Sequence, residues 1–147
     1  MNATVNISDI NHEDLVNLFS TSLYGNNKWC VDYDREEYEK ECLTDSRDCI
    51  EDKIAKLLLA GCSIEISDLY SEDETDGYGK VMHAWDKENE CMVYNITLED
   101  VRKGLNKASR KGYHKLVMDL AYEPGDLDMF DADLLLQFIV FGDYVYG

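Results

Sequence analysis

Four aspartates near the C-terminus have the residue type and the close spacing of a calcium site: Asp126, Asp128, Asp131 and Asp133. An EF-hand loop that began at Asp126 would need glycine at its sixth position and glutamate at its twelfth. The chain has Asp131 and Gln137 at these positions. We therefore predict no metal site, and expect Asp131 to cap a helix with Asp133 favourably placed near its N-terminal dipole.

Cysteine and histidine side chains could supply a nucleophile with its base, or a zinc site. The chain contains the cysteines Cys30, Cys42, Cys49, Cys62 and Cys91 and the histidines His12, His83 and His114. No two cysteines are spaced as Cys-x-x-Cys, and His12-Glu13 lacks the second histidine of a zinc-protease motif. We therefore expect buried free thiols in a reducing compartment, no zinc, no cofactor and no enzymatic activity.

The charge balance excludes some classes of partner. The 147 residues include 31 acidic and 14 basic side chains, so the formal net charge is -17. Proteins that bind nucleic acid through its phosphates neutralise them with lysine and arginine, and anionic membranes attract the same side chains. We therefore expect no direct contact with nucleic acid or membrane, and a partner that is basic.

The acidic residues gather in three runs, 32–52, 65–76 and 119–133, and we select the first run and the 72–76 loop as the candidate surface. Carboxylates one helical turn apart have Cβ atoms about 5–6 Å apart, a spacing comparable to that of charges along a nucleic acid backbone. We expect these carboxylates to bind a basic groove of the partner: Asp32, Asp34, Glu36, Glu37, Glu41, Asp45, Asp48, Asp52, Glu72, Asp73, Glu74 and Asp76. Reversal of Asp45, Asp48 and Asp52 to lysine is then expected to abolish binding and to leave the fold intact.

These carboxylates must be positioned by helices around a small antiparallel sheet, in a single α+β domain over residues 1–147. Hydrophobic periodicity predicts helices over 8–25, 34–42, 46–60, 97–111 and 113–122. The expected N-caps include Ser8, Ser46 and Thr97, the last with Asp100 in a capping box. Alternating patterns predict a strand over 62–70, then an acidic loop over 71–79 and a hairpin that pairs 80–85 with 91–96.

A final helix, capped by Asp131, is apolar all round over 134–141, so we expect it to lie at the centre of the core. This run is the longest apolar one, and it is too short to span a bilayer, which takes about 20 residues. The first ten residues lack the basic start and apolar centre of a signal peptide. We therefore expect a soluble, cytoplasmic protein.

The segments TLEDVRKGLNKA (97–108) and DADLLLQFIVFGDYVYG (131–147) resemble a family of small acidic proteins from phages and prophages of Firmicutes. Lys28-Trp29-Cys30 is similar to an aromatic connector in that family. The chain departs from the family pattern in a longer acidic segment over about 71–89 and in Ala60-Gly61, where a double glycine is common. The resemblance implies a phage accessory protein in the host cytoplasm, and it supplies no catalytic residues.

Charge and resemblance together lead to one favoured function and two alternatives. The favoured function is a non-enzymatic inhibitor of a bacterial anti-phage nuclease, of the anti-CRISPR or anti-restriction kind, whose acidic surface mimics nucleic acid in a basic groove. One alternative is a small-ligand module that sequesters a nucleotide signal, with Arg102, Lys103 or Lys107 holding phosphate. The other is a self-assembling phage structural protein, a homodimer included, with Tyr144-Val145-Tyr146 as the contact.

Overall fold

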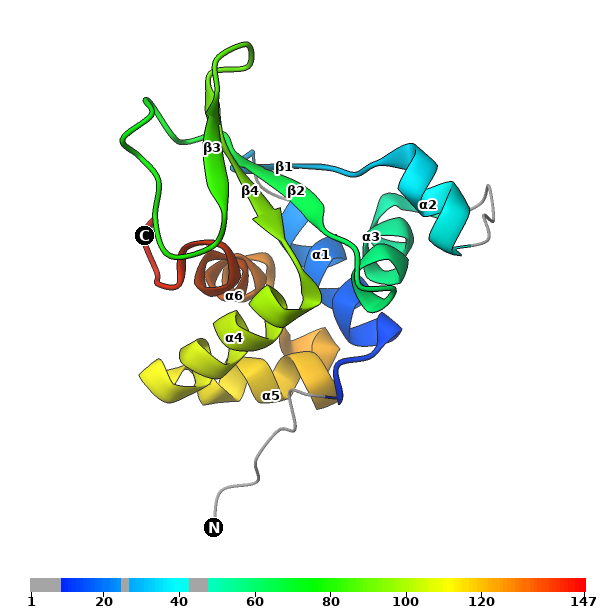
Figure 1. The fold of residues 1–147 in the computed structure, drawn as a ribbon. Coiled ribbons are helices and arrows are strands. Elements are labelled where there is room, and N and C mark those ends of the chain that lie inside the picture. Colours follow the sequence, from blue (N-terminus) through cyan, green and yellow to red (C-terminus); the bar gives the residue numbers. More distant parts are fainter. Residues whose placement is uncertain (1–8, 25–26, 43–47) are drawn as a thin grey trace.

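The fold was obtained as a computed structural model, which describes residues 9–24, 27–42 and 48–147. Helices pack on one face of an antiparallel sheet, so the expected α+β domain is confirmed (Figure 1). The elements follow one another as α1 (His12–Leu23), β1 (Trp29–Asp32), α2 (Arg35–Cys42), α3 (Ile50–Leu59), β2 (Ile64–Asp68), β3 (His83–Asp86), β4 (Cys91–Ile96), α4 (Leu98–Ala108), α5 (His114–Tyr122) and α6 (Met129–Phe141). A wide helical turn (Ser109–Tyr113) joins α4 to α5, and a short 3-10 turn (Pro124–Asp126) precedes α6.

The four strands are arranged in the order β1-β2-β4-β3, with every neighbouring pair antiparallel. The predicted strand and hairpin correspond to β2, β3 and β4. The edge strand β1 was not predicted; residues 29–32 become a strand by pairing with β2. Alternate residues face the helices and are buried, as Ile64, Ile66 and Tyr94 show. The residues between them face the open side of the sheet.

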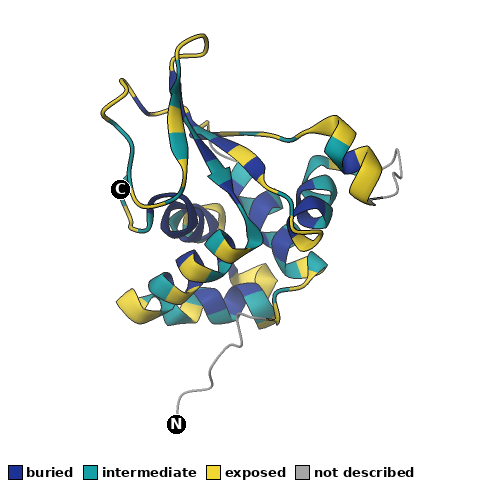
Figure 2. Cartoon of the chain, viewed as in Figure 1, coloured by how far each residue is buried: buried dark blue, intermediate teal, exposed yellow. Residues whose placement is uncertain are grey.

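Helix α6 forms the centre of the core, as its apolar sequence predicts (Figure 2). Its Phe141 ring contacts Trp29 and Tyr94 of the sheet, at 5.4 Å between ring centroids in both pairs. On its other side α6 meets α4 at Gly104, where an added Cβ would lie 2.3 Å from the Cα of Ile139. The absence of a side chain at Gly104 therefore permits the close contact between the two helices.

Three predicted helix starts are wrong, because each helix begins after a residue other than the predicted cap. Helix α1 is capped by Asn11, whose side chain accepts from the Asp14 N–H; Ser8, the predicted cap, lies outside the described residues. Helix α3 begins at Ile50, after Cys49, and not at Ser46, which also lies outside the described residues. Helix α6 is capped by Asp128, whose Oδ1 accepts from the Asp131 N–H at 2.8 Å.

Two local predictions for α4, its N-terminal cap and the break that follows it, are confirmed. Thr97 caps α4 in a reciprocal capping box with Asp100. The break between α4 and α5 falls at Gly112, whose φ of 103° lies in the left-handed region that favours glycine. Among the described residues, none of the helices has both the length and the apolar character needed to span a membrane.

The cysteines differ in part from the expectation of buried thiols. Cys91 is buried, and its burial raises the pKa of the thiol. Cys62 is half-buried, whereas Cys30 and Cys49 are exposed. Cys30 is exposed because it occupies an outward-facing position of β1, a strand that was not expected. Exposed thiols on a strand and at a helix start show that residue type alone does not fix burial.

Candidate functional site

Four carboxylates gather around a hollow of about 330 Å³ on the open side of the sheet. Asp32 lies at the end of β1, Asp34 and Glu37 lie at the start of α2, and Glu65 lies on β2. We call this group the acidic hollow. Its wall is completed by Tyr33, Ser63 and Asn95. Three of the four carboxylates belong to the predicted partner-binding set, and Glu65 does not.

The register of the sheet brings two of these carboxylates together. Asp32 is the Cα partner of Glu65, and Glu65 is in turn the partner of Asn95 on β4. Both acidic side chains are exposed on the face away from the helices. Like charges directly opposite each other on neighbouring strands destabilise a sheet. Folding therefore places a repulsive pair at the floor of the acidic hollow.

The other two carboxylates are held by the start of α2. Asp34 caps this helix, with its Oδ1 accepting from the Glu36 N–H at 3.0 Å and from the Glu37 N–H at 3.2 Å. Glu37 follows in the first turn. Neither residue, nor Asp32 or Glu65, forms an ion pair with another described residue. The acidic hollow thus carries four carboxylates without a neutralising cation from the described part of the chain.

Lys53 of α3 contacts the aromatic ring and the hydroxyl group of Tyr33, which lines the acidic hollow. Its Nζ donates to the Tyr33 hydroxyl at 3.1 Å and lies 5.6 Å and 5.7 Å from the ring centroids of Tyr33 and Tyr38. The contacts of Lys53 with the rings of Tyr33 and Tyr38 join α3 to the segment between β1 and α2. It fixes Tyr33 in the wall of the acidic hollow.

Two predicted partner-binding residues, Asp48 and Asp52, make contacts within the fold. Asp48 accepts from the Tyr38 hydroxyl at 2.6 Å and forms an ion pair with Lys56, so it ties α2 to α3. The hydrogen bonds from Lys56 and then Tyr38 lower the pKa of Asp48. Asp52 accepts from the Cys49 N–H at 3.3 Å and lies 3.0 Å from His12 Nε2 of α1.

These contacts correct the expectation that the lysine triple reversal leaves the fold intact. A lysine at position 48 would face Lys56 and lose the Tyr38 contact, and a lysine at position 52 would lose the His12 contact. The change would therefore alter the packing of α1, α2 and α3 as well as the surface charge. Asp45, the third position, lies outside the described residues.

The second predicted segment, 72–76, folds on itself. Asp76 Oδ2 accepts from the Glu72 N–H at 2.6 Å and from the Asp73 N–H at 3.2 Å, and Asp73 Oδ1 accepts from the Thr75 N–H at 2.8 Å. Glu72 and Glu74 are exposed. This loop and α2 lie at opposite ends of the sheet (Figure 1).

The predicted carboxylates that the structure describes are therefore divided among separate places. On α2, Glu36 and Glu41 are exposed beside the acidic hollow, although they do not line it. The hollow could not be predicted in full because it depends on β1 pairing with β2. The outward position of Glu65 in the predicted strand was the available signal.

Asp133 is buried, and it does not act as a surface charge near the helix start. Its carboxylate accepts from Lys28 Nζ at 2.8 Å, from Trp29 Nε1 at 2.7 Å and from Gln137 Nε2 at 2.8 Å. Gln137 also binds the C-terminal segment, because its Oε1 accepts from the N–H of Tyr146 at 2.8 Å. This network joins the β1 end of the sheet, α6 and the C-terminus.

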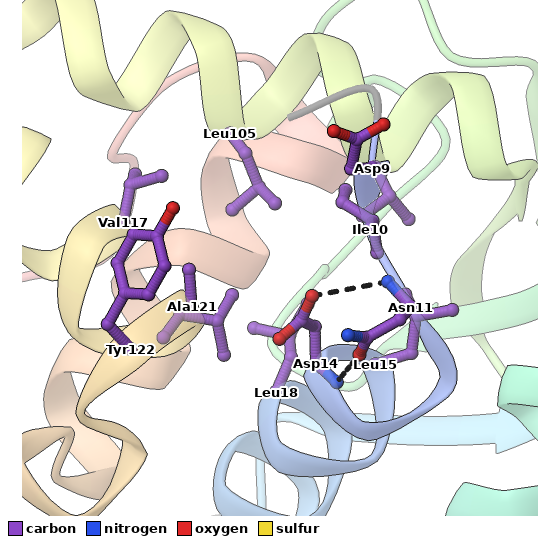
Figure 3. Close-up of a pocket in the computed structure, with 12 residues that line it drawn as sticks. Asp9, Ile10, Asn11, Asp14, Leu15, Leu18, Leu105, Val117, Ala121 and Tyr122 are labelled. Atoms are coloured by element: carbon purple, nitrogen blue, oxygen red, sulfur yellow. Dashed lines mark hydrogen bonds between the residues drawn. The ribbon is translucent and has the colours of Figure 1, made fainter. Parts of the chain in front are cut away.

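A second hollow, of about 170 Å³, lies between α1, α4 and α5 (Figure 3). Leu15, Leu18 and Leu105 provide its apolar wall. Asp14 on its rim accepts from the Asn11 N–H at 3.2 Å, and burial raises the pKa of this carboxyl group. Asn11 and Asp14 belong to the cap of α1, and Asp9 and Tyr122 are the other acidic and hydroxyl side chains that line this hollow.

Within the described residues, no three His, Cys, Asp or Glu side chains are grouped in a way that could hold a metal ion. Comparison with protein-family models, with curated proteins and with solved structures found no match to this chain. The resemblance to acidic phage proteins therefore stays a prediction. The acidic hollow gathers four carboxylates that form no ion pair with the described residues, and such groups are suited to bind cationic side chains.

Proposed function

We propose that the protein is a non-enzymatic inhibitor that presents the acidic hollow to the basic, nucleic-acid-binding groove of another protein. The observation that carries this proposal is the repulsive pair of Asp32 and Glu65, placed beside Asp34 and Glu37 with no described cation to neutralise them. The resemblance to acidic phage proteins indicates the kind of partner: a bacterial anti-phage nuclease, of a CRISPR or restriction system.

The energetics of the pair support a role outside the fold. Asp32 Oδ1 accepts from the Tyr33 N–H at 2.8 Å, but Asp32 and Glu65 still place like charges opposite each other on neighbouring strands, which lowers the stability of a sheet. Lysine or arginine side chains of a partner would remove this repulsion, so part of the binding free energy would come from relief of strain within the inhibitor. The net charge of -17 would also steer a basic partner toward the protein and speed association at low salt.

The first experiment captures the partner and compares it with a variant of the acidic hollow. Tagged protein is incubated with lysate of a Firmicute host at low and high salt, and bound proteins are identified by mass spectrometry. The hollow variant carries Asp32→Asn, Asp34→Asn, Glu37→Gln and Glu65→Gln. Asparagine is as good an N-cap as aspartate, so the start of α2 is preserved.

A matched control variant carries four changes at exposed acids away from the acidic hollow: Glu13→Gln, Glu88→Gln, Glu90→Gln and Glu123→Gln. Both variants lose four negative charges, so they differ only in where the charges are lost. We expect wild type and control to retain a nuclease at low salt, and duplex DNA or RNA to displace it. Equal retention by the two variants would contradict the proposal, as would a capture without any nucleic-acid-binding protein.

A further inference from the structure

Three lysines surround a hollow of about 390 Å³ on a different part of the molecule. Lys103 and Lys107 come from α4, and Lys80 comes from the segment before β3. We call this group the lysine hollow. Its apolar wall is formed by Phe138 and Phe141 of α6, among other residues. The sequence indicated Lys103 and Lys107 as phosphate-binding candidates but gave no reason to add Lys80.

Local structure explains how the lysines converge. Lys103 and Lys107 are four residues apart on α4 and therefore lie on the same face of the helix. Lys80 follows Gly79, whose φ is 74° and whose added Cβ would lie 2.3 Å from the Phe141 carbonyl oxygen. The segment that carries Lys80 is thus held tightly against the end of α6. The three lysines therefore come from α4 and from the segment before β3, which both pack against α6.

The ammonium groups of these lysines have no ion-pair or hydrogen-bond partner among the described residues, although acids outnumber bases in the chain by 31 to 14. Asp100 also lines the hollow, but its Oδ2 accepts from the Thr97 N–H and from the Thr97 hydroxyl, both at 2.9 Å. The lysine hollow therefore has an excess of positive charge. In a protein of net charge -17, three lysines beside one carboxylate reverse the local balance of charged side chains.

One of the three lysines has a structural explanation. Lys107 Nζ lies 3.5 Å from the position of a Cβ built on Gly142, at the C-terminal end of α6, where the helix dipole favours a cation. The dipole does not account for Lys80 or Lys103. Like charges at positions four apart on a helix, as at 103 and 107, destabilise it. A bound anion would offset this repulsion.

We propose that the lysine hollow binds a small organic phosphate that carries at least two phosphate groups. The phosphate oxygens accept hydrogen bonds from Lys80, Lys103 and Lys107, and the organic part lies against the apolar wall. A volume of about 390 Å³ fits a small molecule. Lysine is a common phosphate ligand in proteins. A long nucleic acid strand is disfavoured by the net charge of the whole protein.

The test is isothermal titration of the purified protein with ADP and with inorganic pyrophosphate, at fixed ionic strength. EDTA is included, because magnesium could otherwise bridge phosphate to the abundant carboxylates. We expect wild type to bind both compounds and to bind ADP more tightly, since ADP alone has an organic part. The lysine variant, Lys80→Gln, Lys103→Gln and Lys107→Gln, is expected to weaken ADP binding at least tenfold.

Two further variants keep the test decisive. The control variant, Lys40→Gln, Lys87→Gln and Lys111→Gln, removes three exposed positive charges elsewhere and is expected to stay within twofold of wild type. Arginine at positions 80, 103 and 107 is expected to retain binding, which separates loss of charge from loss of fold. The proposal is overturned if wild type binds neither compound at millimolar concentration, or if lysine and control variants lose binding equally. It is also overturned if a single-stranded oligonucleotide binds more tightly than ADP.

Discussion

The carboxylate of Asp133 accepts hydrogen bonds from Lys28, Trp29 and Gln137 in a region that excludes most water. A buried charge is tolerated only when it is paired and hydrogen-bonded, and Asp133 meets both conditions. Glu65 is the opposite case, because it is exposed and faces another carboxylate. Residue type does not distinguish the two, so the sequence could not show that Asp133 is structural and that Glu65 belongs to the acidic hollow.

Replacement of Asp133 by asparagine tests the buried network. The amide has nearly the same shape, but it removes the negative charge that Asp133 offers to Lys28 and turns one acceptor into a donor that faces other donors. Breaking a buried ion pair typically costs 3–5 kcal/mol, so we expect the free energy of unfolding to fall by about 3 kcal/mol. Urea unfolding measures the change. Asp143→Asn, at an exposed position, is the matched control, and an equal effect of both changes would refute the structural role of Asp133.

The buried carboxyl group of Asp68 makes the free energy of unfolding depend on pH. It is fully buried; its Oδ2 accepts from the Tyr146 hydroxyl at 2.7 Å and its Oδ1 accepts from the Tyr70 N–H at 3.0 Å. Burial raises the pKa of Asp68, so the folded chain holds this proton at pH values where the unfolded chain has lost it. The stabilising contribution of Asp68 to the free energy of unfolding is therefore present at low pH and is lost as the pH rises through the raised pKa.

The comparison is between wild type and Asp68→Asn, unfolded in urea across a pH series. We expect wild type to lose stability relative to the variant as the pH rises above about 4, the usual pKa of an unfolded aspartate. Asp86 is a control for which we expect the opposite pH dependence of stability. The hydrogen bonds from the Asn89 side chain and backbone lower the pKa of Asp86. A difference between wild type and Asp68→Asn that stays constant with pH would contradict the account.

At the scale of elements, the contact of α4 with α6 depends on Gly104. An added Cβ would lie 2.3 Å from the Cα of Ile139, which is backbone and cannot move aside as a side chain can. Alanine favours a helix over glycine by about 1 kcal/mol, but overpacking costs roughly 1–3 kcal/mol. We expect Gly104→Ala to lower the free energy of unfolding. Asn106→Ala, exposed on the same helix, should instead be neutral or stabilising.

The elements that the sequence predicts correctly are those with local causes. The Thr97–Asp100 capping box, the β3–β4 hairpin and the apolar α6 each depend on residues that are close in the chain. Strand β1 was missed because a strand of four residues is defined by its pairing with β2. The acidic hollow was predicted only in part for the same reason, since the position of Glu65 opposite Asp32 is a consequence of that pairing.

At the scale of the whole molecule, opposite charges that have no described partner are gathered in separate places. The acidic hollow lies where β1 meets α2, and the lysine hollow lies where α4 meets the end of α6. A surface selected only for solubility would disperse its charges, so two concentrations of opposite sign favour two binding functions. The lysine hollow was not predictable as a unit, because Lys80 reaches α4 only through the path of the loop before β3.

The repulsion between Asp32 and Glu65 makes the free energy of unfolding of this strongly acidic protein depend on salt concentration. We expect Glu65→Gln to raise the free energy of unfolding by roughly 0.2–1 kcal/mol at low salt, because it removes the repulsion from Asp32. The gain should shrink as sodium chloride screens the pair. Glu90→Gln, at an exposed position away from the acidic hollow, is the control. A loss of stability in Glu65→Gln would mean that the carboxylate supports the fold.

The most direct test of the central claim is the binding of the captured nuclease to wild type, to the hollow variant and to the control variant. Surface plasmon resonance at low salt gives the association rate and the Kd for each. We expect the hollow variant to associate more slowly and to bind at least tenfold more weakly, and the control variant to stay within twofold of wild type. Equal weakening of the two variants would show that only total charge matters, and unchanged binding of the hollow variant would place the interface elsewhere.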